Sequence, residues 1–207
     1  MRVSRFAFLT AVFVFALGSI SFAHLKEGID AYYEGRYSLA LKELRPLAEA
    51  NDPEAQFYLG VMYGKGKGVP QDYQAAVRWY QLAAEQGFPK AMSNLASMYS
   101  RGKGVPKDYE QAIHWYQEAA EEELPEAQYN LGVMYKEGQG VPRDLVQAHM
   151  WFNLSSGQGH KDAYRARLLV SRMMKPEDIA EAQKLAREWR EKKERCKAAT
   201  LDDIPCP

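Results

Sequence analysis

The chain is built from a repeated sequence. Prolines at positions 53, 89 and 125 stand 36 residues apart, and apolar residues follow each of them at the same intervals. Each copy also contains a close variant of the motif GxGVPxDxxxAxxWY, in which x is any residue. A fixed period of about 20 to 50 residues indicates a stacked array of similar units rather than a globule around one buried site.

The first half of each copy has the pattern of a helix, which we call helix A. In the first copy Ala55, Leu59, Met62 and Tyr63 follow the spacing i, i+4, i+7 and i+8, which places them on one side of a helix. Pro53 suits the first helical position, because the N–H that proline lacks has no partner there. The same residues recur at equivalent positions in the second and third copies.

A loop and a second helix, helix B, follow in each copy. In the first copy Gly66 and Gly68 permit positive φ angles, and Asp72 is a good N-cap for the next helix. Val69 is expected to place its side chain between the two helices. Helix B then carries small and aromatic side chains on one face and ends at Gly87, which suits a left-handed cap.

These residues resemble the Sel1-like repeat, a relative of the tetratricopeptide repeats with a longer loop between its helices. The resemblance extends through residues 55–87 and 127–159, whereas the middle copy departs from the pattern at Met92, Ala96 and Glu123. It implies an all-α fold, a right-handed superhelical solenoid of Sel1-like and tetratricopeptide-like α/α helix pairs.

The flanks extend the array at both ends. Gly28, Gly35, Tyr37 and Ala40 have the spacing of a tetratricopeptide unit with a tight turn, and a polar final helix is suited to cover the last repeat. The expected organisation is a signal peptide at 1–23, an N-terminal helix pair at 24–52, repeats at 53–88, 89–124 and 125–160, a capping helix pair at 161–195 and a tail at 196–207.

The first residues have the pattern of a secretory signal peptide. Arg2 and Arg5 precede an apolar segment that is too short to span a membrane, and a small-x-small cleavage sequence ends at Ala23. A membrane anchor is the weaker alternative, since no basic flank follows. We therefore expect a periplasmic or secreted protein whose mature chain begins at His24 and which does not insert into the membrane after cleavage.

The charge of the mature chain argues against nucleic-acid binding. The full chain has 27 basic and 27 acidic residues, and removal of residues 1–23 takes away two arginines, which leaves 25 against 27, or a formal charge of −2. We expect a monomer without cofactors.

Both cysteines, Cys196 and Cys206, lie near the C-terminus. In an exported chain this even count predicts a disulfide between them, with two free thiols as the alternative. Neither cysteine has a histidine near it in sequence, so a nucleophilic role is not expected.

The sequence contains no recognisable catalytic or metal-binding motif. His114 and His149 are expected to be packing or surface residues, and the repeats supply no serine with a neighbouring lysine or histidine base. His24, as a mature N-terminus, could chelate copper through its amine and ring, but that arrangement requires a second histidine on a rigid scaffold. We therefore predict no catalytic residue, no cofactor site and no metal site.

Two surfaces of the array could meet a partner. The first is a basic edge formed by residues of equivalent loops. The alternative is that these residues are simply solvated, and the acidic run 121–123 would partly cancel their positive charge. Its residues are Lys65, Lys67, Arg101, Lys103, Lys107, Lys136 and Arg143.

The second surface is the concave face, which the resemblance assigns to helix A. Positions that vary between copies are expected to face solvent there, and aromatic residues at such positions suit a groove that grips a partner segment. Asn94 and Asn130 either hydrogen-bond the backbone of an extended peptide or contact neighbouring helices. Tyr58 is also expected to face solvent there, and the partner-binding residues are predicted to be Glu54, Phe57, Val61, Lys90, Ser93, Asn94, Ser97, Glu126, Tyr129, Asn130 and Val133.

Two classes of function stay open from the sequence. The resemblance implies a non-enzymatic scaffold of the bacterial cell envelope, an adaptor or regulator that binds a protein or peptide on the concave face. The alternative is a secreted repeat protein that binds or hydrolyses peptidoglycan or β-lactams. Relatives linked to that activity carry a cysteine pair in every repeat, whereas this chain has no cysteine before position 196. The scaffold is therefore the favoured prediction.

Overall fold

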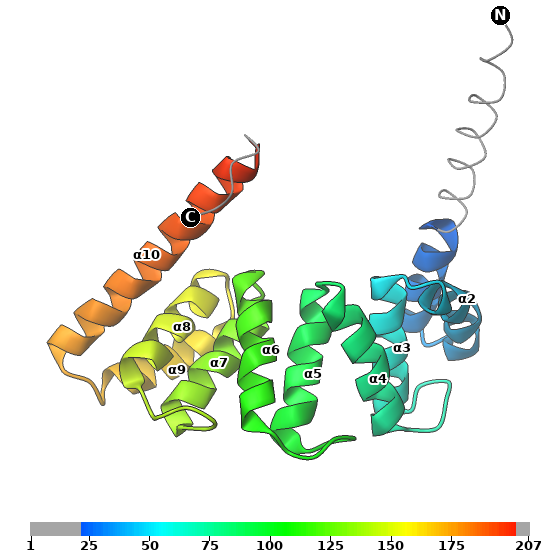
Figure 1. The fold of residues 1–207 in the computed structure, drawn as a ribbon, viewed down its shortest axis with the longest axis horizontal. Coiled ribbons are helices and arrows are strands. Elements are labelled where there is room, and N and C mark those ends of the chain that lie inside the picture. The colour runs from blue at the N-terminus through cyan, green and yellow to red at the C-terminus, as the bar shows by residue number, and fades with distance from the viewer. Residues whose placement is uncertain (1–21, 202–207) are drawn as a thin grey trace, which may run out of the picture. The chain divides into compact units, whose positions relative to one another are not determined.

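The computed structural model of the chain describes residues 22–201, with the backbone alone at 200 and 201 (Figure 1). The expected signal peptide, apart from Phe22 and Ala23, lies outside these residues, and so does Cys206. Within the described part every regular element is an α-helix. No helix in that part is both long enough and apolar enough to cross a membrane.

The helices follow the repeat pattern. Residues 22–33 are helical, and α3, α5 and α7 begin at Pro53, Pro89 and Pro125 as predicted. The remaining bounds are α2 (Tyr37–Glu49), α3 (Pro53–Lys65), α4 (Tyr73–Glu85), α5 (Pro89–Arg101), α6 (Tyr109–Glu121), α7 (Pro125–Glu137), α8 (Leu145–Gly157), α9 (Lys161–Ser171) and α10 (Pro176–Leu201). The predicted all-α architecture of repeated helix pairs is confirmed.

The chain divides into two compact units, and the division falls within the middle repeat. Unit 1 runs up to Met98 and also contains Gly102–Pro106, and unit 2 contains Tyr99–Arg101 and the chain from Lys107 onward. The core of unit 1 contains Leu44, Leu59 and Met62, and Val69 packs against it. The superhelical hand of the whole array stays a prediction.

The local signals in the sequence determine where the helices begin and end. The Asp72 carboxylate accepts a hydrogen bond from the Ala75 N–H at 2.9 Å and caps α4, and Asp144 caps α8 through Gln147 at the same distance. Gly66 ends α3 in the left-handed conformation, with φ at 65°. These helix ends are therefore specified by residues next to them in the sequence.

A glycine in each loop docks on the start of the preceding helix B. At Gly104, where φ is +74°, an added Cβ atom would lie 2.3 Å from the carbonyl oxygen of Tyr73. No side chain fits such a position, because both the backbone angle and the space require glycine. The three contacts are Gly68 with Tyr37, Gly104 with Tyr73 and Gly140 with Tyr109.

A buried glutamine joins successive helices in the first repeat. Gln56 on α3 donates from Nε2 to the Ala48 carbonyl oxygen at the end of α2, at 3.2 Å. Its Oε1 accepts from Nε2 of Gln86, which follows α4, at 2.8 Å. Because both ends of the buried amide have partners, the polar group stabilises the stacking instead of opposing it.

The third repeat uses the same device, and the middle repeat replaces it. Gln128 donates to the Ala120 carbonyl oxygen at 3.3 Å and accepts from Gln158 at 3.0 Å. In the middle copy Met92 and Glu122 occupy the two positions, and Met92 is buried. In the middle repeat, a buried methionine and an exposed glutamate thus replace the pair of hydrogen-bonded glutamines.

The last helix is longer than the sequence suggests. The predicted tail begins at Cys196, whereas α10 continues to Leu201, so residues 196–201 are helical. The sequence offers no glycine or proline before Pro205 to end the helix. Contacts within unit 2 also hold it, because Lys193 pairs with Glu121 at 2.6 Å and Lys197 with Glu123 at 2.6 Å.

The glycine contact makes a prediction about stability. Gly87→Ala should cost about 1 to 2 kcal/mol, the ordinary price of a left-handed alanine, because nothing lies within 4 Å of its added Cβ. Gly104→Ala has a similar φ angle but also meets the Tyr73 backbone, and overpacking should add about 1 to 3 kcal/mol. Denaturant titration of the two variants measures the difference. Equal losses of stability would contradict the docking contact.

Candidate functional site

The predicted partner-binding residues lie in both units. Those on α3 and α5, from Glu54 to Ser97, belong to unit 1, and those on α7, from Glu126 to Val133, belong to unit 2. Each group is therefore described by itself.

The expectation that all these positions face solvent is wrong at Tyr58, Val61 and Ser93, which are buried. The Tyr58 ring packs against Tyr32 and Tyr33 of the N-terminal helix, with centroids 5.5 and 6.2 Å apart, and its hydroxyl hydrogen-bonds that of Tyr33 at 3.1 Å. Burial raises the pKa of the Tyr58 phenol. The N-terminal helix pair covers this part of α3, and the short Ser93 side chain does not project past its neighbours.

The two aromatic residues expected on an open groove are packed within their own repeats. The Phe57 ring lies 6.1 Å from that of Tyr80 on α4 and 5.3 Å from that of Phe88. Tyr129 repeats the arrangement one unit later, with its ring 5.7 Å from that of Phe152 and stacked on His160 at 4.8 Å. Both side chains are half-buried, so the prediction that they lie outside the helix seams is wrong.

The asparagines differ from each other. The Asn94 amide hydrogen-bonds the hydroxyl of Tyr80. Burial raises the pKa of this hydroxyl, and the hydrogen bond from Asn94 offsets only part of the rise. For Asn94 the structure therefore favours contact with a neighbouring helix. Asn130 is half-buried, and so are Glu54, Ser97 and Val133, of which Val133 packs against the α8 core. Lys90 and Glu126 are exposed.

Much of the predicted basic edge is occupied by contacts within the chain. Lys67 and Lys103 lie over the rings of Tyr37 and Tyr73, at 5.1 and 5.2 Å from the ring centroids, beside the docking glycines. Lys107 lies 4.5 Å from the ring centroid of Tyr109. Lys136 pairs with Glu137 at 2.8 Å, and Arg143 donates to the Lys136 carbonyl oxygen at 3.2 Å. Lys65 and Arg101 are exposed.

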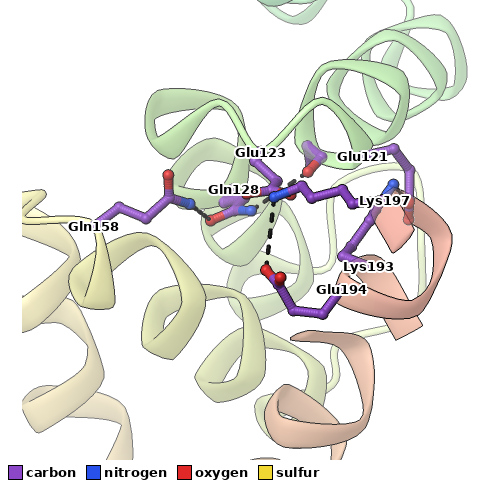
Figure 2. A network of polar contacts seen from close by, with 8 residues as sticks. Glu121, Glu123, Gln128, Gln158, Lys193, Glu194 and Lys197 are labelled. Carbon is purple, nitrogen blue, oxygen red and sulfur yellow. Dashed lines mark hydrogen bonds and ion pairs between the residues drawn. The ribbon is translucent and has the colours of Figure 1, made fainter. Parts of the chain in front are cut away.

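The acidic run meets α10 (Figure 2). Lys193 and Lys197 carry the ion pairs with Glu121 and Glu123, and Lys197 also lies 3.7 Å from Glu194. Trp189 adds an edge contact to Trp151, with centroids 6.1 Å apart. An open pocket of about 530 Å³ lies beside this network, lined by residues 121–123 and by Lys193, Cys196 and Lys197. These acidic residues hold α10 in place. The predicted disulfide stays a prediction, since Cys206 is outside the described residues.

One exposed apolar surface was not found by sequence reasoning. On α9 and just after it, Tyr164, Leu168, Leu169 and Met173 are 52%, 43%, 60% and 57% exposed. Ala163 and Val170 face the core instead. The available signal was the number of large apolar residues around the helix, because Tyr164, Leu168, Leu169 and Met173 lie on the side opposite Ala163 and Val170.

Basic side chains accompany these apolar ones. Lys161, Arg165 and Arg172 are exposed, and helical spacing places them between the pair Tyr164 and Leu168 and the pair Leu169 and Met173. We call these seven residues the α9 face. An open pocket of about 370 Å³ adjoins it, lined by Ser156, Gly159, His160, Lys161, Tyr164 and Arg165.

A serine and a histidine meet in unit 2, but their geometry is structural. His149 Nε2 lies 3.1 Å from Ser171 Oγ, which donates to the Arg167 carbonyl oxygen at 2.9 Å. His149 is buried, as a packing residue would be, and burial lowers its pKa. His114 is exposed.

A possible set of metal ligands occurs in unit 1, where the sequence predicted none. Nδ1 of His24 lies 2.6 Å from Oε2 of Glu43, and Glu27 offers a third ligand atom near both. Sequence reasoning missed the cluster because Glu43 comes from α2, 19 residues after His24.

Comparison with known proteins identifies the repeat. A family model described as Sel1 repeat matches residues 53–88, 89–123 and 125–160. A crystal structure of a Sel1 repeat protein from Oxalobacter formigenes is similar, with a TM-score of 0.66, 34% identity, and coverage of 70% of this chain and 60% of that chain.

A second solved structure is c5321, a protective antigen present in uropathogenic Escherichia coli strains that displays an SLR fold. It has a TM-score of 0.60 and 27% identity, and the match covers 90% of this chain and 49% of that chain. The chain thus spans 60% and 49% of the lengths of these two proteins. No curated protein matches it.

The packing of the two groove aromatics makes a prediction. Phe57→Ala with Tyr129→Ala should lower the free energy of unfolding by about 2 kcal/mol or more per site, since large-to-small changes at packed aromatics typically cost about 3 to 5 kcal/mol when burial is complete. Denaturant titration measures the loss, and Lys90→Ala, an exposed change on α5, is the control. A double variant as stable as the control would show that these rings do not support the repeats.

Proposed function

Because this chain belongs to the Sel1 repeat family, we propose that it is a non-enzymatic scaffold that holds a protein partner in the bacterial cell envelope. Sel1 repeats generally mediate protein–protein interaction, and the family is typically non-catalytic. Repeat arrays suit this task because they present an extended surface on a rigid frame.

The exposed α9 face is the observation that carries this proposal. Four large apolar side chains on one segment each expose about half of their surface to solvent, and interface anchors are of this kind. The basic residues between them would attract a partner of opposite charge. The fitting partner is a protein segment with acidic residues and apolar anchors.

The second part of the proposal concerns the predicted contacts on helix A, of which fewer residues are accessible than the sequence suggested. Lys90 and Glu126 are exposed and remain available to a partner, whereas Phe57 and Tyr129 are engaged in their own repeats. Lys90 and Glu126 are each a polar contact that its own unit offers, and the apolar anchors of unit 2 are those of the α9 face.

The proposed location in the cell envelope rests on the sequence of the predicted signal peptide, residues 1–23. A signal peptide that ends at Ala23 would export the chain to the periplasm or beyond, where an oxidising environment would allow Cys196 and Cys206 to form a disulfide. The hydrolytic alternative has weaker support, because the hydroxyl of Ser171 donates to a backbone carbonyl and the histidine beside it is buried.

The α9 face can be tested with two charge substitutions. Leu169→Glu with Met173→Glu should reduce crosslinked recovery of the partner from native envelope extract by at least about tenfold, because anchors of this type are worth about 2 kcal/mol each. Both side chains are more than half exposed, so circular dichroism should show an unchanged helix content.

Two controls identify the surface that binds. Lys65→Glu with Arg101→Glu alters exposed residues of the basic edge, and Lys90→Glu with Glu126→Lys alters the exposed helix-A positions. Unchanged recovery with the α9 variant would refute the α9 face as the contact. Loss of recovery with only one of the control pairs would assign the contact to that surface instead.

A further inference from the structure

The N-terminal helix pair brings three metal-ligating side chains together. His24 and Glu27 stand three residues apart on the helix at 22–33, so they share one side of it, and Glu43 faces them from α2. The three candidate ligand atoms all lie within 4.8 Å of one another. The nearest pair is Nδ1 of His24 and Oε2 of Glu43, at 2.6 Å.

Glu43 is an unusual residue for a purely structural role. Its side chain is only 10% exposed and lies beside Leu44 and Gly28 in the seam between the two helices. A buried carboxylate requires a positive partner, because removal of a charge from water is costly. Its other cation, Lys42, lies 3.4 Å away with its side chain 77% exposed, so it can leave without disturbing the core.

We infer that His24, Glu27 and Glu43 bind a divalent transition metal ion, with Cu(II) the preferred ion. One imidazole nitrogen and two carboxylate oxygens form a ligand set that such ions accept, and Cu(II) is the tightest binder among them at a given set of nitrogen and oxygen ligands. Metal-ligand bonds of about 2 Å place two ligands of one ion about 3 to 4 Å apart. Small rotations of the exposed His24 and Glu27 side chains are sufficient to reach that spacing.

A bound ion would take the place of the direct contact between Nδ1 of His24 and Oε2 of Glu43. The ion would also join the helix at 22–33 to α2.

The proposed cleavage after Ala23 would add a fourth ligand. In a chain that begins at His24, the free α-amine and Nδ1 belong to one residue and can chelate the same ion, which gives two nitrogen and two oxygen ligands. The fourth ligand depends on the proposed export of the chain, whereas metal binding by the three side chains does not. Copper chelation by His24 was expected to require a second histidine, and in this site the two carboxylates of Glu27 and Glu43 take its place.

The test is a Cu(II) titration of the purified protein, after its intact mass has established whether the chain begins at His24. We expect one ion per chain, an electron paramagnetic resonance signal with nitrogen coupling, and a rise in melting temperature. His24→Ala should weaken binding by at least about 100-fold, since even outer-shell changes cost about 10- to 100-fold. Glu43→Gln and the exposed Glu27→Gln should each weaken it by at least about tenfold.

The controls separate this site from ordinary copper binding at a flexible terminus. His114→Ala, an exposed histidine in unit 2, should leave the affinity unchanged, and 8 M urea, at about the concentration that unfolds small domains, should weaken it. Binding that survives both Glu27→Gln and Glu43→Gln, or that persists in urea, would overturn the site. If the mass shows a chain that begins before His24, the export proposal fails, and the same titration still decides whether the three side chains bind the ion.

Discussion

The docking of each loop glycine on the backbone of the preceding helix B is the contact on which the repeats depend. At Gly104 the approach to Tyr73 is so close that even one added carbon atom would clash with the backbone. The loop of one repeat is thereby fixed to the helix pair before it, and Gly68, Gly104 and Gly140, which stand 36 residues apart, all make this contact. The lysines that precede Gly68 and Gly104 lie over the tyrosine rings and extend the contact. Residues that resemble a basic binding edge in the sequence are thus partly structural.

The local structure could be predicted from the sequence, and the exposure of side chains could not. Pro53, Asp72 and Gly66 act within a few residues of their own positions, so the helix starts, caps and loop were predicted correctly. Tyr58 is covered by tyrosines of the N-terminal helix, and Phe57 by Phe88, and no repeat pattern specifies these contacts. The same reason explains the missed cluster, in which His24 and Glu43 come from different helices. The segment of α9 was predicted only as part of a capping helix pair, and the repeat pattern did not indicate that Leu168 and Leu169 would be exposed.

These findings relate function to the places where the repeat pattern stops. Inside the repeats the variable aromatic positions are used for packing, as at Phe57 and Tyr129. The α9 face follows the third repeat, and the proposed metal site precedes the first. An element that flanks an array has a face without a repeated neighbour, so its side chains are available for other tasks. Sel1 repeats supply the frame in this account, and the flanking helices supply the proposed binding surfaces.

Hydrogen exchange of the wild-type chain and the Gly140→Ala variant tests the coupling between repeats most directly. If the loop holds the preceding helix, the variant should lose amide protection in the first turns of α6, which begins at Tyr109, as well as in its own loop. Gly159→Ala, which meets nothing within 4 Å, should change protection only near position 159. Loss of protection in Gly140→Ala that stays within residues 138–144 would contradict the account.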